Sequence, residues 1–124
     1  MLRKVAFTLY PVSDMEAARA FYEGVLGLES NSGASSPWVE YDLPGGGCFA
    51  ITTVMPVSPN PASGAMIAFE VDDLDATIAQ VRAKGGRLAG GEEVKGPHCR
   101  MLNVFDPDGN TMILHQLDQA VASA

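Results

Sequence analysis

A repeat inside the chain is the feature that most constrains its fold, because two similar segments predict two similar structural units. At an offset of 59 residues, the segment VSDMEAARAFYEGVLG (residues 12–27) aligns with VDDLDATIAQVRAKGG (residues 71–86). The identical pairs include Val12/Val71, Asp14/Asp73, Ala17/Ala76 and Gly27/Gly86. The 124 residues therefore predict two copies of one unit, within the usual size of a single domain.

Each copy has the pattern of a strand followed by a helix. An apolar run, KVAFTLYPV or AMIAFEV, precedes an aspartate that can accept hydrogen bonds from the free N–H groups of a helix start. Glycine follows each helix, as Gly27 in the first copy and as Gly85 and Gly86 in the second, where a left-handed residue commonly ends a helix. Helical spacing gives each helix one apolar face, made of Met15, Ala18, Tyr22, Val25 and Leu26 or of Leu74, Ile78 and Val81.

Strands are predicted after each helix. The segment PWVEYDLPGGGCFAITTV predicts two strands joined by a Pro/Gly turn, and RLAGGEEV precedes a hairpin in CRMLNVFDPDGNTMILHQL that turns at Pro107 and Gly109. The predicted fold class is α+β, with two βαβββ modules that form a curved mixed sheet cup and carry the helices on its outer face. The single domain 1–124 divides into module 1 at about 1–54, a proline-rich linker at about 55–64, module 2 at about 65–117 and a short tail at 118–124.

Charge and cysteine content exclude several classes of partner. A net charge of −7 argues against nucleic acid and anionic membrane surfaces, because proteins bind both through lysine and arginine. No apolar run approaches the length of a membrane span or a secretion signal, so we expect a cytoplasmic protein. Cys48 and Cys99 form no CxxC pair, which predicts two free thiols rather than a zinc cluster or a disulfide framework.

The order of these elements, with the segments VSDMEAARAFYEGVLGL, FEVDDLDATIAQVRAKGG and DPDGN, resembles the vicinal oxygen chelate superfamily. That superfamily includes glyoxalase I, extradiol dioxygenases, thiol transferases that inactivate fosfomycin, and bleomycin-binding resistance proteins. The resemblance covers nearly the whole chain and implies the fold, whereas the chemistry of a member depends on four strand positions in the cavity. It also implies a homodimer, because two chains or two halves often complete each cup.

In metal-dependent members the four cavity positions hold the metal ligands. The resemblance carries these positions onto Phe7, Ala50, Met66 and Ile113. Phe, Ala and Ile offer no lone pair to a divalent metal, and the thioether of Met66 suits only soft metals. We therefore predict no metal at this place, and no other cofactor.

Strand alternation, together with the parity that the resemblance implies for residues 99–103, extends these positions to a predicted ligand pocket. Its residues are Phe7, Leu9, Trp38, Cys48, Ala50, Met66, Cys99, Met101, Asn103, Ile113 and His115, with His98 and Arg100 at the rim. Most are apolar, as is usual in ligand sites that contain a few directed polar groups. Alternation does not decide which of Trp38, Glu40 and Tyr41 face inward. The competing interpretation is that the same side chains fill the cup and form a core.

Three functions are compatible with the sequence. The first is metal-independent binding of a small, largely apolar or aromatic molecule in the cup, as the resemblance to bleomycin-resistance-type proteins implies. The second is a lyase, isomerase or transferase that uses a displaced metal site or metal-free acid/base residues, with His115, Glu70 and Glu40 as candidate catalytic groups. A histidine beside Cys48 or Cys99 would add a thiolate pair to this second function. The third is a structural or interaction module with a filled cup.

Overall fold

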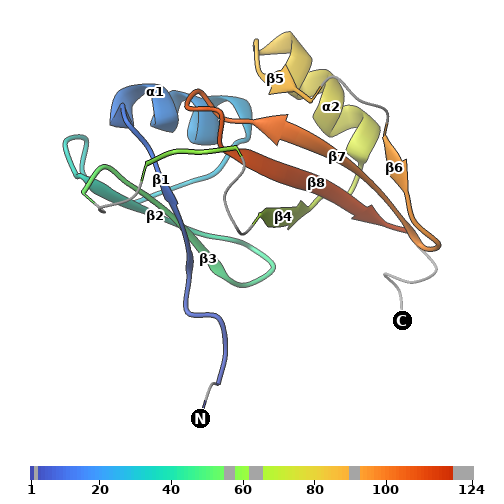
Figure 1. Ribbon diagram of the computed structural model, residues 1–124, viewed down its shortest axis with the longest axis horizontal. Helices are drawn as coiled ribbons and strands as arrows, with labels where there is room; N and C mark the ends of the chain where they lie inside the picture. Colours follow the sequence, from blue (N-terminus) through green and yellow to red (C-terminus); the bar gives the residue numbers. More distant parts are fainter. Residues whose placement is uncertain (2, 55–57, 62–65, 90–92, 119–124) are drawn as a thin grey trace.

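The computed structural model describes residues 1, 3–54, 58–61, 66–89 and 93–118, so most of the predicted linker and tail lie outside the described residues. The chain forms a mixed α+β fold, as predicted (Figure 1). Its elements in order are β1 (Thr8–Pro11), α1 (Met15–Arg19), the π-helix η1 (Ala20–Val25), β2 (Trp38–Asp42), β3 (Cys48–Thr52), β4 (Ile67–Glu70), α2 (Leu74–Ala83), β5 (Arg87–Leu88), β6 (Val94–Lys95), β7 (Cys99–Phe105) and β8 (Thr111–Leu117).

Both helices begin and end as the repeat predicts. The carboxylates of Asp14 and Asp73 each accept a hydrogen bond from the backbone N–H three residues later, at 3.1 and 3.0 Å. Each aspartate thus satisfies one of the donors that a helix start leaves free. Beyond the helices, Gly27 and Gly85 adopt φ values of 78° and 77°. Glycine reaches this left-handed region without the steric cost that a Cβ atom brings.

The first helix is not the uniform α-helix that its spacing predicts. From Ala20 to Val25 it is a π-helix, in which the N–H of Leu26 donates to the carbonyl of Phe21 five residues earlier (3.0 Å). The wider turn allows the adjacent Phe21 and Tyr22 both to enter the core, where they are 5% and 0% exposed. Packing of two neighbouring aromatic rings thus overrides the regular helical period.

The strands are divided between two sheets. The first has the order β1-β3-β2, with β1 parallel and β2 antiparallel to β3. The second has the order β4-β8-β7-β5, with β6 also paired to β7 and with β4 parallel to β8. Within the described residues no strand pairing joins the two sheets. The two halves therefore keep the same parallel pairing of their first and last strands, but as separate sheets.

The first half has two strands after its helix, where the βαβββ pattern predicts three. Residues 29–36, ESNSGASS, include no β-branched or aromatic residue, which are the types that favour strands. The guanidinium of Arg19 instead donates to the backbone carbonyls of Gly33 (2.8 Å) and Ser32 (3.5 Å). This segment is consequently held by a helix side chain rather than by strand pairing.

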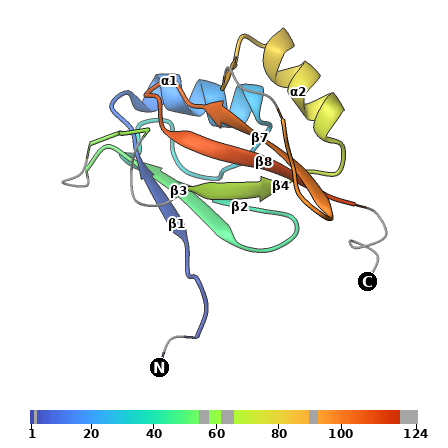
Figure 2. The ribbon, with the colours of Figure 1, turned by 45° about the vertical axis from the view of Figure 1, so that its right-hand side comes forward.

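One hydrophobic core lies between the helices and the two sheets. Figures 1 and 2 both place α1 and α2 on the same side of the strands. The Tyr10 hydroxyl connects the two halves, because it donates to the carbonyl of Thr111 (2.7 Å) and accepts from the N–H of Ile67 (2.8 Å). In the part of the chain that the structure describes, no helix has the length and apolar character to cross a membrane. Completely buried core residues include Tyr22, Val39, Tyr41, Phe49, Ile51, Leu74, Val81, Val104 and Met112.

Two hairpin turns occupy equivalent places in the two halves. Residues 43–47 (LPGGG) connect β2 to β3, and residues 106–110 (DPDGN) connect β7 to β8. In both turns the first N–H donates to the fifth carbonyl, at 3.0 Å, and the fourth N–H donates to the first carbonyl, at 2.9 and 3.0 Å. The fourth residue is a glycine with positive φ, 105° at Gly46 and 85° at Gly109. The predicted turn at Pro107 and Gly109 is confirmed, and the first half repeats its backbone.

Candidate functional site

Each sheet has a second face, opposite the core, which we call the open face. On β2, Val39 and Tyr41 are buried in the core, so Trp38 and Glu40 lie on the open face by strand alternation. The question that the sequence left undecided is thereby answered, because Trp38 and Glu40 share one face and Tyr41 lies on the other. Strand pairing continues this face onto β3, where Ala50 lies opposite Glu40.

An aromatic pair forms the centre of the open face on the first sheet. The rings of Phe7 and Trp38 meet edge to face, with their centroids 5.7 Å apart and their planes at 81°. The indole Nε1 of Trp38 donates a hydrogen bond to Glu40 Oε2 (2.9 Å), which holds a carboxylate beside the aromatic surface. Phe7 is 44% exposed. The same face also carries Leu9, Cys48 and the completely buried Ala50.

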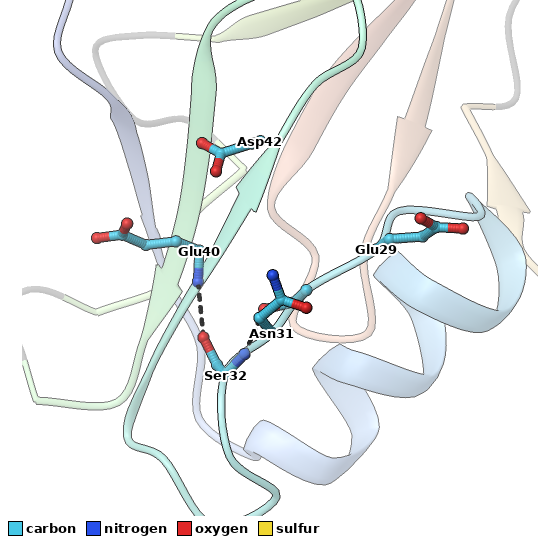
Figure 3. A pocket seen from close by; sticks show the side chains of 6 residues that line it. Glu29, Asn31, Ser32, Glu40 and Asp42 are labelled. Atoms are coloured by element: carbon cyan, nitrogen blue, oxygen red, sulfur yellow. Dashed lines mark hydrogen bonds between the residues drawn. The ribbon is translucent and has the colours of Figure 1, made fainter.

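An acidic notch includes Glu40, the hydrogen-bond partner of Trp38 (Figure 3). The Ser32 hydroxyl accepts from the backbone N–H of Glu40 (3.4 Å) and so holds residues 29–32 beside β2. The carboxylates of Glu29, Glu40 and Asp42 point in different directions. Among the described residues, no three His, Cys, Asp or Glu side chains are grouped so that they could hold a metal. The notch has a volume of about 470 Å³ and is lined by Glu29, Ser30, Asn31, Ser32, Glu40 and Asp42.

The second sheet presents its open face by the same alternation. Leu102 and Val104 are buried toward the helices, so Cys99, Met101 and Asn103 lie on the opposite side of β7. Pairing places Asn103 opposite Ile113 and Met101 opposite His115 on β8. The structure therefore brings these predicted pocket residues onto one face, separate from the Phe7 and Trp38 group on the first sheet.

A histidine and a carboxylate form a pair on this second sheet. His115 Nδ1 lies 2.6 Å from Glu70 Oε1, and Glu70 Oε2 accepts from the backbone N–H of Leu117 (2.8 Å). Because a carboxylate accepts hydrogen bonds, this contact favours the tautomer that carries its hydrogen on Nδ1. Nε2 is then the basic nitrogen of the neutral ring. The pair is partly open to solvent, with side chains 22% and 51% exposed, so a molecule on the open face could reach it.

The donor set at the four cavity positions does not fit a divalent metal. Ala50 and Ile113 each stand four residues after a turn glycine and occupy equivalent places on β3 and β8. Phe7 and Met66 each precede the first residue of β1 or β4. Three of these four side chains carry no lone pair, and a single thioether cannot replace the oxygen and imidazole ligands that such metals require.

The two residues predicted at the pocket rim have different surroundings. His98 is exposed at the start of β7, where its carbonyl accepts from the N–H of Asp118 (2.9 Å). Arg100 has the parity of Leu102 and therefore lies on the side of the helices, where it donates to Glu93 (2.6 Å) and Asp75 (2.6 Å). These two carboxylates raise the pKa of the guanidinium. The structure thus does not bring Arg100 to the open face, because two acidic partners hold it elsewhere.

Both cysteines are free, as the sequence predicts, and they are partly buried. Burial, followed by the nearby carboxylates of Glu40 and Asp42, raises the pKa of the Cys48 thiol. A raised pKa disfavours the thiolate, which is the nucleophilic form. The contact of His115 Nδ1 is with Glu70 and not with a sulfur atom. The thiolate pair considered from the sequence therefore gains no support.

Sequence reasoning missed two features, the acidic notch and a cleft of about 830 Å³ between the halves. The notch depends on residues 29–32, whose path beside β2 is irregular and follows no hydrophobic period. The cleft depends on how the halves pack, which no single segment determines. One signal was present in the repeat, since the turns LPGGG and DPDGN share Pro and Gly positions but differ in polarity.

Comparison with known proteins adds to this geometry. A family model described as the Glyoxalase/Bleomycin resistance protein/Dioxygenase superfamily matches residues 4–114. A "Glyoxylase-like domain-containing protein" from Didymella fabae is 33% identical over 107 residues, which are 82% of this chain and 84% of that protein. Among solved structures, the chain is similar to TnmS3, an antibiotic binding protein from Streptomyces sp. CB03234, with a TM-score of 0.76, 26% identity, and coverage of 94% and 98%. The fosfomycin resistance protein FosX from Mesorhizobium loti shares the fold at a TM-score of 0.69 and 21% identity, over 100% of both chains.

Proposed function

Because this chain belongs to the glyoxalase/bleomycin resistance protein/dioxygenase superfamily, we propose that it binds a small, largely apolar or aromatic molecule on its open face without a metal. The observation that carries this proposal is the partly exposed pair of Phe7 and Trp38, held beside the Glu40 carboxylate. Aromatic rings favour edge-to-face or offset contacts with a further ring, and such contacts add to the gain from burial.

The composition of the open face supports a binding role. Apolar side chains at Leu9, Met101 and Ile113 supply contact area, and Asn103 and His115 supply directed polar atoms. Ligand sites typically combine a mostly apolar surface with a few such groups. The likeness to TnmS3, described as an antibiotic binding protein, supports the same role.

A homodimer, acting in the cytoplasm, is part of this proposal. Large apolar side chains are exposed at Val5 (76%), Phe7 (44%), Met66 (45%) and Val94 (58%). A second chain or a ligand that covered them would remove apolar area from water. Sedimentation equilibrium tests the dimer, and a monomer at all accessible concentrations would contradict it. Of the predicted cup residues, Phe7 and Met66 are exposed and Ala50 is completely buried, so a filled cup, the third function considered above, stays a competing interpretation.

The fluorescence of Trp38 tests the binding proposal, because it is the only tryptophan of the chain and lies on the open face. A series of neutral two- and three-ring aromatic compounds should include members that change its emission saturably. The same compounds should raise the free energy of unfolding, by about 2.7 kcal/mol at 100 times Kd.

Two variants and a metal analysis sharpen this test. Phe7→Ala should weaken binding, and the matched Val54→Ala, which removes another exposed apolar side chain, should not. Mass spectrometry of the native protein should find no stoichiometric metal. The proposal fails if no compound changes both the emission and the unfolding temperature, or if one metal ion per chain copurifies and stabilises the fold.

The pair of Glu70 and His115 favours a second candidate function, a metal-free acid/base enzyme. The carboxylate orients the ring, and Nε2 would take a proton from a molecule bound beside Ile113. Mass spectrometry of compounds that bind would detect a product. His115→Gln should then abolish turnover and leave Kd within about twofold, whereas unchanged compounds in every case would reject this function.

A further inference from the structure

The cleft between the halves shares Ala68 and Glu70 with the open face of the second sheet, and the rest of its lining lies outside that face. Its apolar wall comes from both halves, and Ile67, Phe69 and Leu114 belong to the core side of the second sheet. Its volume of about 830 Å³ lies in the range of small-molecule sites. The larger apolar side chains of the wall are Leu26, Leu28, Leu43, Ile67, Phe69, Val71 and Leu114.

The equivalent place in the other half is closed by the turn DPDGN. Asp106 accepts from the Tyr22 hydroxyl (2.7 Å), and Asp108 accepts from the backbone N–H of Ser13 (3.0 Å). The Asn110 side chain donates to the carbonyl of Pro11 (2.7 Å). Three polar side chains of this turn therefore attach it to the start of the first helix and to β1.

The turn LPGGG cannot make these attachments. Its first, third and fifth residues are Leu43, Gly45 and Gly47, which carry no polar side-chain atom. The repeat also places Val81 where the first half has Tyr22, and Asp72 where it has Ser13. The turn LPGGG thus has no polar side chain to meet Asp72, and Val81 lacks the hydroxyl that Tyr22 donates. This difference is the structural reason why a cleft is present between LPGGG and α2.

The charged groups around the cleft are all acidic. Glu70, Asp72 and Asp73 line it, and no Lys, Arg or His belongs to its lining among the described residues. Asp73 is used to cap α2, and Glu70 is paired with His115. Asp72 is exposed and makes no hydrogen bond or ion pair with a described residue.

We infer that this cleft is a second ligand site, which binds a small organic cation with an apolar body and a protonated amine. The apolar wall would bury the body, and Asp72 would attract the amine with support from Glu70 and Asp73. An organic anion of the same shape would be repelled by the same three carboxylates. The inference does not rest on the binding proposed for the open face, although Glu70 belongs to both places.

A matched pair of probes tests the charge preference. Naphthalen-1-ylmethylamine and naphthalene-1-acetate share one aromatic body and carry opposite charges at pH 7. In isothermal titration the amine should bind saturably and about threefold or more tighter than the acetate. Trp38 emission reports the open face, so binding in the cleft should leave that emission unchanged.

Variants on and beside the cleft locate the amine. Ala76 lines the cleft on α2 and Ala79 is an exposed residue of the same helix outside its lining, so Ala76→Leu should abolish amine binding and Ala79→Leu should preserve it. Asp72→Asn should weaken it about two- to fivefold, whereas Glu16→Gln, which removes an exposed carboxylate of α1, should not.

Three outcomes would overturn the inference. The first is equal affinity for amine and acetate, which would mean that the carboxylates select nothing. The second is an equal effect of Asp72→Asn and Glu16→Gln, which would reduce the preference to the net negative charge of the chain. The third is a wild-type protein that does not bind the amine and forms a dimer that Ala76→Leu dissociates, because a second copy of the chain would then be the occupant.

Discussion

The two hairpin turns have nearly the same backbone and opposite effects on their surroundings. Residues 43–47 and 106–110 share a proline at the second place, a left-handed glycine at the fourth, and the same two backbone hydrogen bonds. One turn is attached to the other half of the molecule and the other borders a cleft. Backbone geometry in this fold is therefore specified separately from the contacts that join the halves.

Asp106 shows how much one side chain contributes to the closed junction, by which we mean the attachment of the turn DPDGN to the first half. It is completely buried, and its carboxylate accepts hydrogen bonds from the Tyr22 hydroxyl, the Asn110 side chain, and the N–H groups of Asp108 and Asn110. A buried charge is costly unless it is fully hydrogen-bonded. Leu43, its equivalent in LPGGG, is apolar and partly exposed, so its side chain needs no hydrogen-bond partner.

Removal of this carboxylate should have the largest effect on stability. Asp106→Ala leaves the buried Tyr22 hydroxyl without its acceptor, and we expect a loss of about 3–5 kcal/mol in the free energy of unfolding. Leu43→Ala at the equivalent place should cost about 1 kcal/mol, since its side chain is only partly buried. Urea unfolding measures both variants, and equal losses would contradict the difference drawn between the two turns.

The shared backbone predicts a smaller effect that is the same in both turns. Gly46→Ala and Gly109→Ala place a Cβ atom at φ values of 105° and 85°, and neither Cβ would meet a neighbouring atom. Backbone strain alone should therefore lower the free energy of unfolding, by about 1–2 kcal/mol for each variant. Thermal unfolding of the two variants should therefore show similar losses. A cost confined to Gly109→Ala would mean that LPGGG can relax where DPDGN cannot.

Alkaline pH should weaken the closed junction through Tyr22. Burial, followed by the charge of Asp106, raises the pKa of this phenol, so the unfolded chain loses the proton at lower pH than the folded chain. The stability that depends on the neutral phenol is complete below about pH 10 and decreases above it.

The loss of stability that results from the raised pKa of Tyr22 should reach about 1.4 kcal/mol at pH 11. Wild type should therefore lose about that much more stability than Tyr22→Phe between pH 8 and pH 11, as measured by urea unfolding at both pH values. The other two tyrosines, Tyr10 and Tyr41, also have raised pKa values and are present in both proteins, so they cancel. Equal losses would show that Tyr22 ionises as it does in the unfolded chain.

Features set by a few neighbouring residues were predictable from the sequence. The caps at Asp14 and Asp73, the glycines after both helices and the turn at Pro107 each depend on a local conformational preference. Strand alternation likewise separated Leu102 and Val104 from Met101 and Asn103, because every second side chain of a strand lies on the same face.

Features that depend on distant partners were not predictable. The π-helix follows from packing of Phe21 and Tyr22 together in a core that both halves build. The sequence predicted Arg100 at the pocket rim, but in the structure Arg100 donates to Asp75, which lies 25 positions away in the sequence. The cleft also depends on how distant segments pack, and its one sequence signal, the loss of polar residues from DPDGN to LPGGG, does not by itself predict a cavity.

The smallest predicted effect comes from two substitutions that would copy one contact of DPDGN into the turn LPGGG, which borders the cleft. In DPDGN, the Asp108 carboxylate accepts from both the hydroxyl and the N–H of Ser13. The equivalent residues are Gly45, whose added Cβ would meet no atom, and Asp72. Gly45→Asp alone should not stabilise the protein, because the new carboxylate faces the like charge of Asp72. Combined with Asp72→Ser it should recover a favourable coupling of about 0.5 kcal/mol in a double-mutant cycle.

That coupling also connects stability with the proposed cation site. If the new contact draws LPGGG toward α2, the double variant should gain stability and bind naphthalen-1-ylmethylamine more weakly than Asp72→Ser alone. If the coupling is zero, Asp108 and Ser13 only accompany a junction that Asp106 and Tyr22 hold closed. The cleft would then exist chiefly because Leu43 and Val81 replace that buried pair, since an exposed hydrogen bond contributes little beside a buried one.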